Sequence, residues 1–117
     1  MALEAIYVHG GEAGGIDHTP VGALVAGEVV DLGTYVGVVR RPIAAGELGA
    51  IHITGTHDFL KFTGEAIAKW APVYWDEGTN TASGTVGYSE ALIGLCEKAA
   101  AAGDERVRVY LTPGVQL

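Results

Sequence analysis

The sequence has few of the features that mark secreted or membrane proteins. It contains one cysteine, Cys96, so an internal disulfide is excluded, and the apolar neighbours of Cys96 indicate a small buried side chain. No apolar run approaches the roughly 18 residues of a transmembrane helix. The N-terminus lacks the basic region and the long apolar region of a signal peptide. We therefore expect neither a membrane-spanning protein nor one stabilised by disulfides.

Positive charge is also scarce, and its distribution is uneven. No lysine or arginine precedes Arg40, and the net charge of the chain is −7. The same segment carries the acidic residues Glu4, Glu12, Asp17, Glu28 and Asp31. Such a segment is repelled by phosphate backbones and by anionic lipid surfaces. The sequence therefore argues against nucleic-acid and membrane partners.

The remaining composition is that of one folded domain. The chain has 117 residues, of which 49% are hydrophobic and only 18% charged, unlike a disordered chain. It has 18 glycines and four prolines without a collagen-like period. This glycine content favours many tight turns between short strands.

Residues 1–20 differ from the rest of the chain. A short apolar stretch is followed by the glycine-rich sequence of residues 10–15, which is typical of a flexible hinge. We predict a flexible N-terminal arm over residues 1–20 and a single β domain over residues 21–117.

The β domain is predicted from alternating apolar and polar residues. The alternation is cleanest in residues 106–111, which indicates a half-buried antiparallel strand. Its expected inward side chains are Val107, Val109 and Leu111, and its expected outward ones are Arg106, Arg108 and Tyr110. The fold class predicted is mainly all-β, a small antiparallel barrel or sandwich with little helix.

One segment has two possible structures. Residues 89–101 are alanine-rich and have helical propensity, with Ser89 as a possible N-cap. However, residues 35–39 resemble residues 92–96, and residues 45–47 resemble residues 102–104, at one common offset. This internal similarity favours a repeated strand-turn-strand unit, with a strand over 91–96 and a loop or single turn over 97–104. A helix over 89–101 remains the alternative.

No motif of an enzyme is convincing. Residues 87–91 resemble a nucleophile elbow, but all four histidines precede them, whereas that motif requires a later histidine. The glycines of residues 10–15 lack the Gly-Lys-Ser/Thr ending of a phosphate loop. His52, His57 and Asp58 lack the tight spacing of metal ligands. We therefore predict no catalytic, cofactor-binding or metal-binding residue.

Three acidic residues share a context that points to turns instead of catalysis. Glu28, Glu47 and Asp104 each follow an Ala-Gly pair. A carboxylate at this position can accept hydrogen bonds from backbone N–H groups of the turn. We expect these side chains to cap turns at strand entries.

The aromatic and basic residues supply a candidate protein interface. In the segment that follows Pro72, alternation places Val73 and Trp75 in the core and Tyr74 on the opposite face. Arg106 and Arg108 could pair with acidic neighbours across a sheet or with an acidic arm of another subunit. The candidate interface residues are Trp70, Tyr74, Arg106, Arg108 and Tyr110.

These features in order resemble a family of small tailed-phage and prophage proteins, long catalogued as a domain of unknown function and regarded as capsid decoration, or cement, proteins. The resemblance covers residues 21–112. One departure is a turn, usually Ala-Gly-Asp in the family, that is occupied here by Lys69, Trp70 and Ala71 before Pro72. The matching segments are Gly37-Val38, Ala44-Ala45-Gly46, Gly55, Phe59-Leu60-Lys61, Val73-Tyr74-Trp75-Asp76, Ile93-Gly94, residues 100–104 and residues 107–111.

The resemblance implies an all-β fold, a homotrimer and attachment to the outer face of an icosahedral capsid, without catalysis or a cofactor. The implied partners are other copies of the chain and the major capsid protein. The implied location is the virion surface, with host cytoplasm before assembly. Two other functions stay open from the residues alone. One is a small-ligand or glycan-binding module using Trp70, Tyr74 and Trp75; the other is a small metal-dependent hydrolase using His52, His57 and Asp58.

Overall fold

The protein is all-β in the computed structural model, which describes residues 4–10, 15–32, 36–76, 78–84 and 91–111. These residues contain ten strands and no helix, so none of them forms a helix able to cross a membrane. The strands are β1 (Ala5–His9), β2 (Gly15–His18), β3 (Val29–Asp31), β4 (Val36–Val38), β5 (Gly49–His52), β6 (Thr56–Leu60), β7 (Pro72–Asp76), β8 (Thr81–Ser83), β9 (Ala91–Lys98) and β10 (Arg106–Leu111). The predicted fold class is confirmed.

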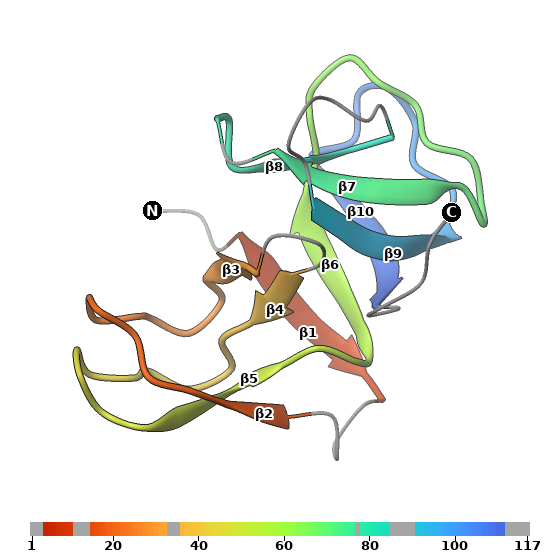
Figure 1. The fold of residues 1–117 in the computed structure, drawn as a ribbon. Helices are drawn as coiled ribbons and strands as arrows, with labels where there is room; N and C mark the ends of the chain where they lie inside the picture. The colour runs from red at the N-terminus through yellow and green to blue at the C-terminus, as the bar shows by residue number, and fades with distance from the viewer. Residues whose placement is uncertain (1–3, 11–14, 33–35, 77, 85–90, 112–117) are drawn as a thin grey trace.

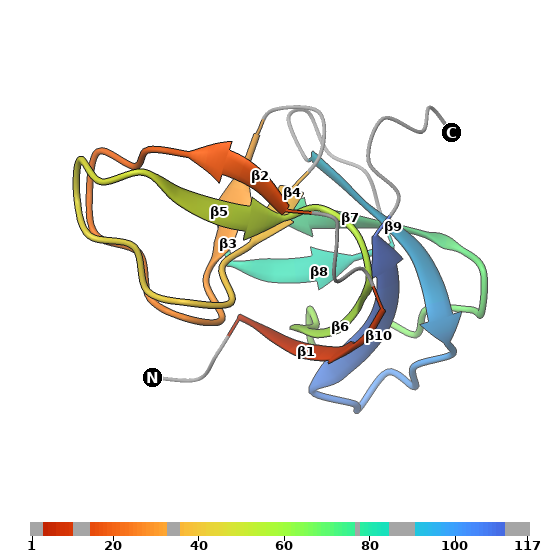
Figure 2. The same cartoon turned by 90° about the horizontal axis from the view of Figure 1, so that it is seen from below.

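The strands form two antiparallel sheets, which Figure 1 shows side by side. The larger has the order β1-β6-β10-β9-β7-β8, and the smaller has the order β2-β5-β4-β3. The larger sheet curls, so that a single parallel bridge joins Lys61, just after β6, to Ala82 of β8 (Figure 2). It does not close into a barrel, and the fold is sandwich-like.

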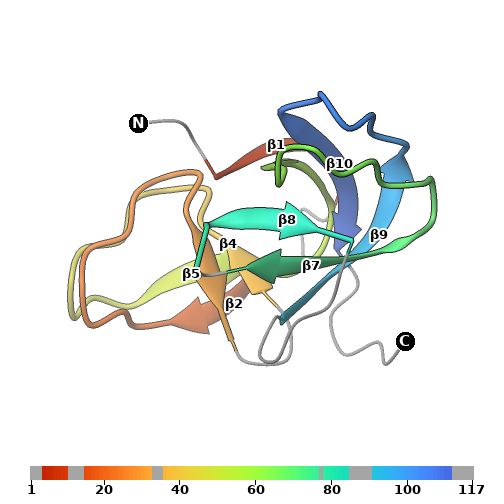
Figure 3. The same cartoon turned by 90° about the horizontal axis from the view of Figure 1, so that it is seen from above.

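The two sheets contain the same four-stranded unit. The first unit has the order β2-β5-β4-β3, and the second unit, within the larger sheet, has the order β6-β10-β9-β7. In both units the first strand along the chain lies beside the last, which is followed across the sheet by the third and then the second. In each unit two loops run side by side, and these loop pairs project at opposite ends of the molecule (Figure 3). Leu24 and Ile43 exchange backbone hydrogen bonds in one pair, and Ile67 and Ala100 do so in the other. The predicted repeat is thereby confirmed.

The N-terminal segment contributes strands to both sheets, which differs from the expected arm over residues 1–20. β1 pairs with β6, and β2 pairs with β5. Ala5 is buried and donates its N–H to Gly27 O at 2.9 Å, while Glu4 Oε1 accepts from Val29 N at 2.8 Å. The reason is that β6 and β5 would otherwise present unpaired backbone edges. Residues 11–14 of the expected hinge lie outside the described residues.

The alanine-rich segment is a strand. β9 lies between β10 and β7 and pairs with both. Ile93 and Cys96 are buried in the main core, as expected for Cys96. Backbone pairing on both sides and burial of these side chains outweigh helix propensity, which is a weak preference of a few tenths of a kcal/mol per residue. The strand predicted over 91–96 is confirmed, and residues 89–90 lie outside the described residues.

The core has two clusters. The main one joins the inner face of the larger sheet to Val36 and Val38 of β4 and includes Phe59, Trp75 and Val109. The smaller one packs Val39, Ile43 and Ile51 within the first unit. As predicted, the inward residues Val107, Val109 and Leu111 of β10 are buried, and so are Val73 and Trp75 of β7.

We predict that Gly37→Ala destabilises the protein by about 1–3 kcal/mol, because a methyl group there would overpack the smaller core cluster. A Cβ on Gly37 would lie 2.7 Å from Ile51 Cδ1 and 3.1 Å from Ile51 Cγ1, and Ile51 is fully buried. Chemical denaturation measures the effect. Gly22→Ala is the matched control, since a Cβ on Gly22 meets nothing within 4 Å. Equal stability of the two variants would contradict the prediction.

Candidate protein interface

Four of the five candidate interface residues lie on the outer face of the larger sheet. On β10, Arg106, Arg108 and Tyr110 alternate with buried valines and therefore point away from the core. Tyr74 lies on the same face, because its neighbours Val73 and Trp75 on β7 are buried. Tyr110 is 47% exposed, and Tyr74 is partly exposed. The sheet therefore presents two aromatic and two cationic side chains on one face.

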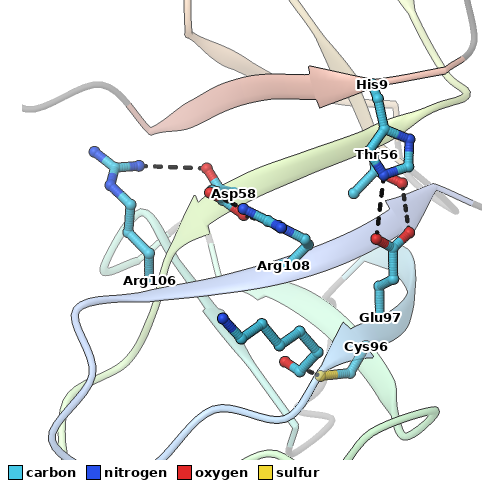
Figure 4. Close-up of polar contacts among 8 residues, drawn as sticks. His9, Thr56, Asp58, Cys96, Glu97, Arg106 and Arg108 are labelled. Atoms are coloured by element: carbon cyan, nitrogen blue, oxygen red, sulfur yellow. Dashed lines mark hydrogen bonds and ion pairs between the residues drawn. The ribbon is translucent and has the colours of Figure 1, made fainter.

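The two arginines meet at one acidic residue of the neighbouring strand (Figure 4). Arg108 Nε donates to Asp58 Oδ1 at 2.9 Å, and a second guanidinium nitrogen donates to Oδ2 at 3.2 Å. Arg106 donates to the backbone oxygen of Asp58 at 3.3 Å. Arg108 and Asp58 are direct cross-strand partners, so the predicted pairing across a sheet is confirmed. This bidentate contact fixes the orientation of the Arg108 guanidinium, which stays partly exposed.

A second polar cluster joins three strands beside the first. Thr56 Oγ1 donates to Glu97 Oε2 at 2.7 Å, and His9 Nε2 lies 3.3 Å from Glu97 Oε1 (Figure 4). The hydrogen bond from Thr56 is the main cause that lowers the pKa of Glu97. The cluster connects β1, β6 and β9 and leaves the His9 side chain mostly exposed. Its contacts are structural and link the N-terminal strand to the sheet.

The fifth candidate, Trp70, lies in the turn that leads into β7. Its backbone N–H donates to Cys96 O of β9 at 2.6 Å, and its side chain is 59% exposed. Lys69 Nζ lies 5.0 Å from the centre of the Trp70 ring, a cation-π distance. Trp70 therefore points outward, whereas Trp75, five residues later, is 1% exposed.

The residues of the two alternative functions do not converge. His57 is fully buried, while Asp58, the next residue on β6, points to the outer face and binds Arg108. His52 lies on β5 of the smaller sheet. Among the described residues no three His, Cys, Asp or Glu side chains group as metal ligands would. Trp70, Tyr74 and Trp75 also fail to form an aromatic platform, since Trp75 is buried on the face opposite Tyr74.

The acidic residues after the Ala-Gly pairs behave as turn caps at two of the three positions. Glu28 Oε1 accepts from Val25 N at 3.1 Å, and Asp104 Oδ2 accepts from Ala101 N at 2.9 Å. At Glu47 the turn is closed by its backbone N–H, which donates to Ala44 O at 3.1 Å. The elbow-like residues 87–90 lie outside the described residues.

Sequence reasoning missed the role of Lys61. This lysine is 3% exposed, and its ammonium group donates to the backbone oxygens of Phe62, Glu65 and Ala102 at 3.0, 2.6 and 3.2 Å. It thereby connects the two loops that run side by side in the second unit. In the sequence, the only indication of this burial was that Lys61 directly follows two apolar residues of a predicted strand.

Arg40, like Lys61, joins separate segments of the chain. Its guanidinium carbon lies 3.9 Å from the centre of the Tyr7 ring, at the side of an open cavity of about 590 Å³. It also donates to Thr54 O at 3.4 Å. Arg40 therefore links β1 to the first unit.

These features define an all-β protein whose outer face carries aromatic and basic side chains and whose candidate catalytic groups stay apart. The family model described as phage cement protein matches residues 8–111, which is most of the chain. The chain therefore belongs to the phage cement protein family and is a phage structural protein of the capsid. No curated protein and no solved structure matches the chain.

Proposed function

We propose that this protein decorates the outer surface of an assembled phage head as a homotrimer and stabilises it, without catalysis or a cofactor. The observation that carries the proposal is the match to the phage cement protein family over residues 8–111. The major capsid protein is the proposed partner, and the proposed location is the virion surface, with host cytoplasm before assembly.

The outer face of the larger sheet suits this role. A cement protein requires an exposed contact surface instead of an enclosed pocket, and aromatic residues and arginine are enriched at such interfaces. Tyr74, Tyr110, Arg106 and Arg108 supply these side chains on a rigid sheet. A trimer would repeat each contact three times and raise the avidity for a repetitive lattice. The net charge of −7 favours solubility before assembly.

Co-sedimentation with phage heads tests the proposal. Purified protein is mixed with procapsids and with expanded heads that lack decoration, and the bound fraction is measured after pelleting. We expect saturable binding to expanded heads, and light scattering of the free protein should give three times the mass of one chain. Binding to neither particle would contradict the proposed function, and a monomeric mass would contradict the trimer.

A further inference from the structure

The turn that carries Trp70 has an exact counterpart in the first unit. Gly27 N donates to Val39 O at 2.6 Å, just as Trp70 N donates to Cys96 O at 2.6 Å. The next residue accepts in return: Glu28 O from Val39 N, and Ala71 O from Cys96 N, both at 2.9 Å. The two turns therefore share one backbone geometry, and Trp70 occupies the position of Gly27.

This position requires a left-handed backbone. Gly27 has a φ of 89°, and Trp70 has a φ of 70°. Glycine adopts such angles without a steric penalty, whereas a bulky side chain places its Cβ too close to the following carbonyl oxygen. The only other described non-glycine residue with positive φ is Asn80, and asparagine tolerates this region. The second unit thus keeps the turn of the first but uses one of the least suitable residues.

Packing inside the domain does not explain the tryptophan. Its side chain is 59% exposed, and it is absent from both core clusters. The ring contact that the structure shows is with Lys69, another exposed side chain. A strained residue whose side chain adds little to the fold is a sign of a functional requirement. Tryptophan is also among the residues enriched at binding hot spots.

The surroundings of Trp70 indicate the chemistry of its partner. The flanking Lys69 places positive charge beside the ring, with its Nζ 5.0 Å from the ring centre, in a chain of net charge −7. We propose that Trp70 is an anchor residue that inserts into an apolar recess bordered by carboxylates on the capsid surface. This inference rests on the proposed function and names the contact that it uses.

Three substitutions separate the ring from the backbone strain. Trp70→Gly and Trp70→Asn remove the ring and suit the left-handed backbone, so we expect melting temperatures at or above that of the unchanged protein. Both should weaken binding to expanded heads about 10-fold or more in co-sedimentation titrations. Trp70→Phe retains an aromatic ring and should keep most of the affinity.

The outcomes distinguish the inference from the proposed function. Loss of affinity in the glycine and asparagine variants, with melting temperatures preserved and binding kept by Trp70→Phe, supports the anchor. If the unchanged protein and Trp70→Gly bind heads equally, the anchor is overturned while the proposed function stands. If affinity and melting temperature fall together in both ring-deleted variants, Trp70 serves the fold and the anchor is also overturned. If the unchanged protein binds no heads, both proposals are overturned.

Discussion

Lys61→Met is expected to lower the free energy of unfolding by about 2–4 kcal/mol, because it removes a charged donor shared by three backbone oxygens. The ammonium group contacts Phe62 O, Glu65 O and Ala102 O, and the lysine side chain is almost completely buried. Methionine has a similar length and fills the space, so the variant tests the hydrogen bonds and not the packing. Chemical denaturation followed by tryptophan fluorescence provides the measurement, because Trp75 reports on the main core.

The effect should be specific to this lysine. Lys98→Met removes the same charge from an exposed position, and we expect a change within about 0.5 kcal/mol. Lys61 connects the loop after β6 to the loop before β10, so its loss should also increase hydrogen exchange at Gly64 and Ile67, whose N–H groups bond to the second loop. Similar stabilities of Lys61→Met and Lys98→Met would show that the three hydrogen bonds contribute little.

The second large effect is acid sensitivity caused by His57. Burial is the main cause that lowers the pKa of His57 from 6.5 to about 4, and the positive charge of Arg40 adds to it. The ring packs between Tyr7 and Phe59, with centroids 5.4 and 6.1 Å away. Neither ring nitrogen has a well-formed hydrogen bond among the described residues, and the Gly55 backbone and the Asp58 charge, which raise the pKa, do not offset burial. The imidazole is therefore neutral in the folded protein at pH 7.

The sign of the pH dependence follows from proton uptake. Between pH 6.5 and about pH 4 the unfolded chain binds a proton at His57 that the folded protein does not bind. The folded state therefore loses stability as the pH falls through this range, by about 2 kcal/mol at pH 5 and about 3 kcal/mol in total. Denaturation curves at pH 7 and pH 5 measure the loss.

His57→Phe isolates this contribution. Phenylalanine fits between the same two rings but does not titrate, so the variant should lose less stability between pH 7 and pH 5 than the unchanged protein does. Glu97, whose pKa is lowered, contributes acid sensitivity in the same direction and remains in both proteins. The difference between the two proteins therefore reports on His57 alone. Equal losses in both proteins would refute the assignment.

Much of the fold was predictable because it depends on local patterns. Strict alternation in residues 106–111 identified the inward and outward sides of β10, and Val73 and Trp75 were placed in the core by the same reasoning. Burial on one face of a sheet imposes a period of two on the sequence, and this signal requires no knowledge of the partner strands. The repeat was also visible, because two copies of one unit retained similar residues at a common offset.

Other elements depend on partners that lie far along the chain. Residues 1–20 have the glycine content of a linker, yet β1 and β2 complete the edges of β6 and β5, which lie far along the chain. The candidate interface was predictable only in part. Alternation identified the outward side chains of β10, but the convergence of Arg106 and Arg108 on Asp58 required the pairing of β10 with β6.

The sequence by itself determined the class of fold, the family, the acidic character and the faces of the strands, since periodicity, composition and motifs are properties of the chain. Tertiary structure decided which loops meet, and so decided the roles of Lys61 and Trp70. Lys61 is buried because carbonyl groups from two loops converge on it. Trp70 is strained because its turn pairs with β9 just as the turn at Gly27 pairs with the chain after β4. Long-range backbone pairing imposes both conditions. The sequence marked Trp70 only as a departure within its turn, and Lys61 only by its place after two apolar residues.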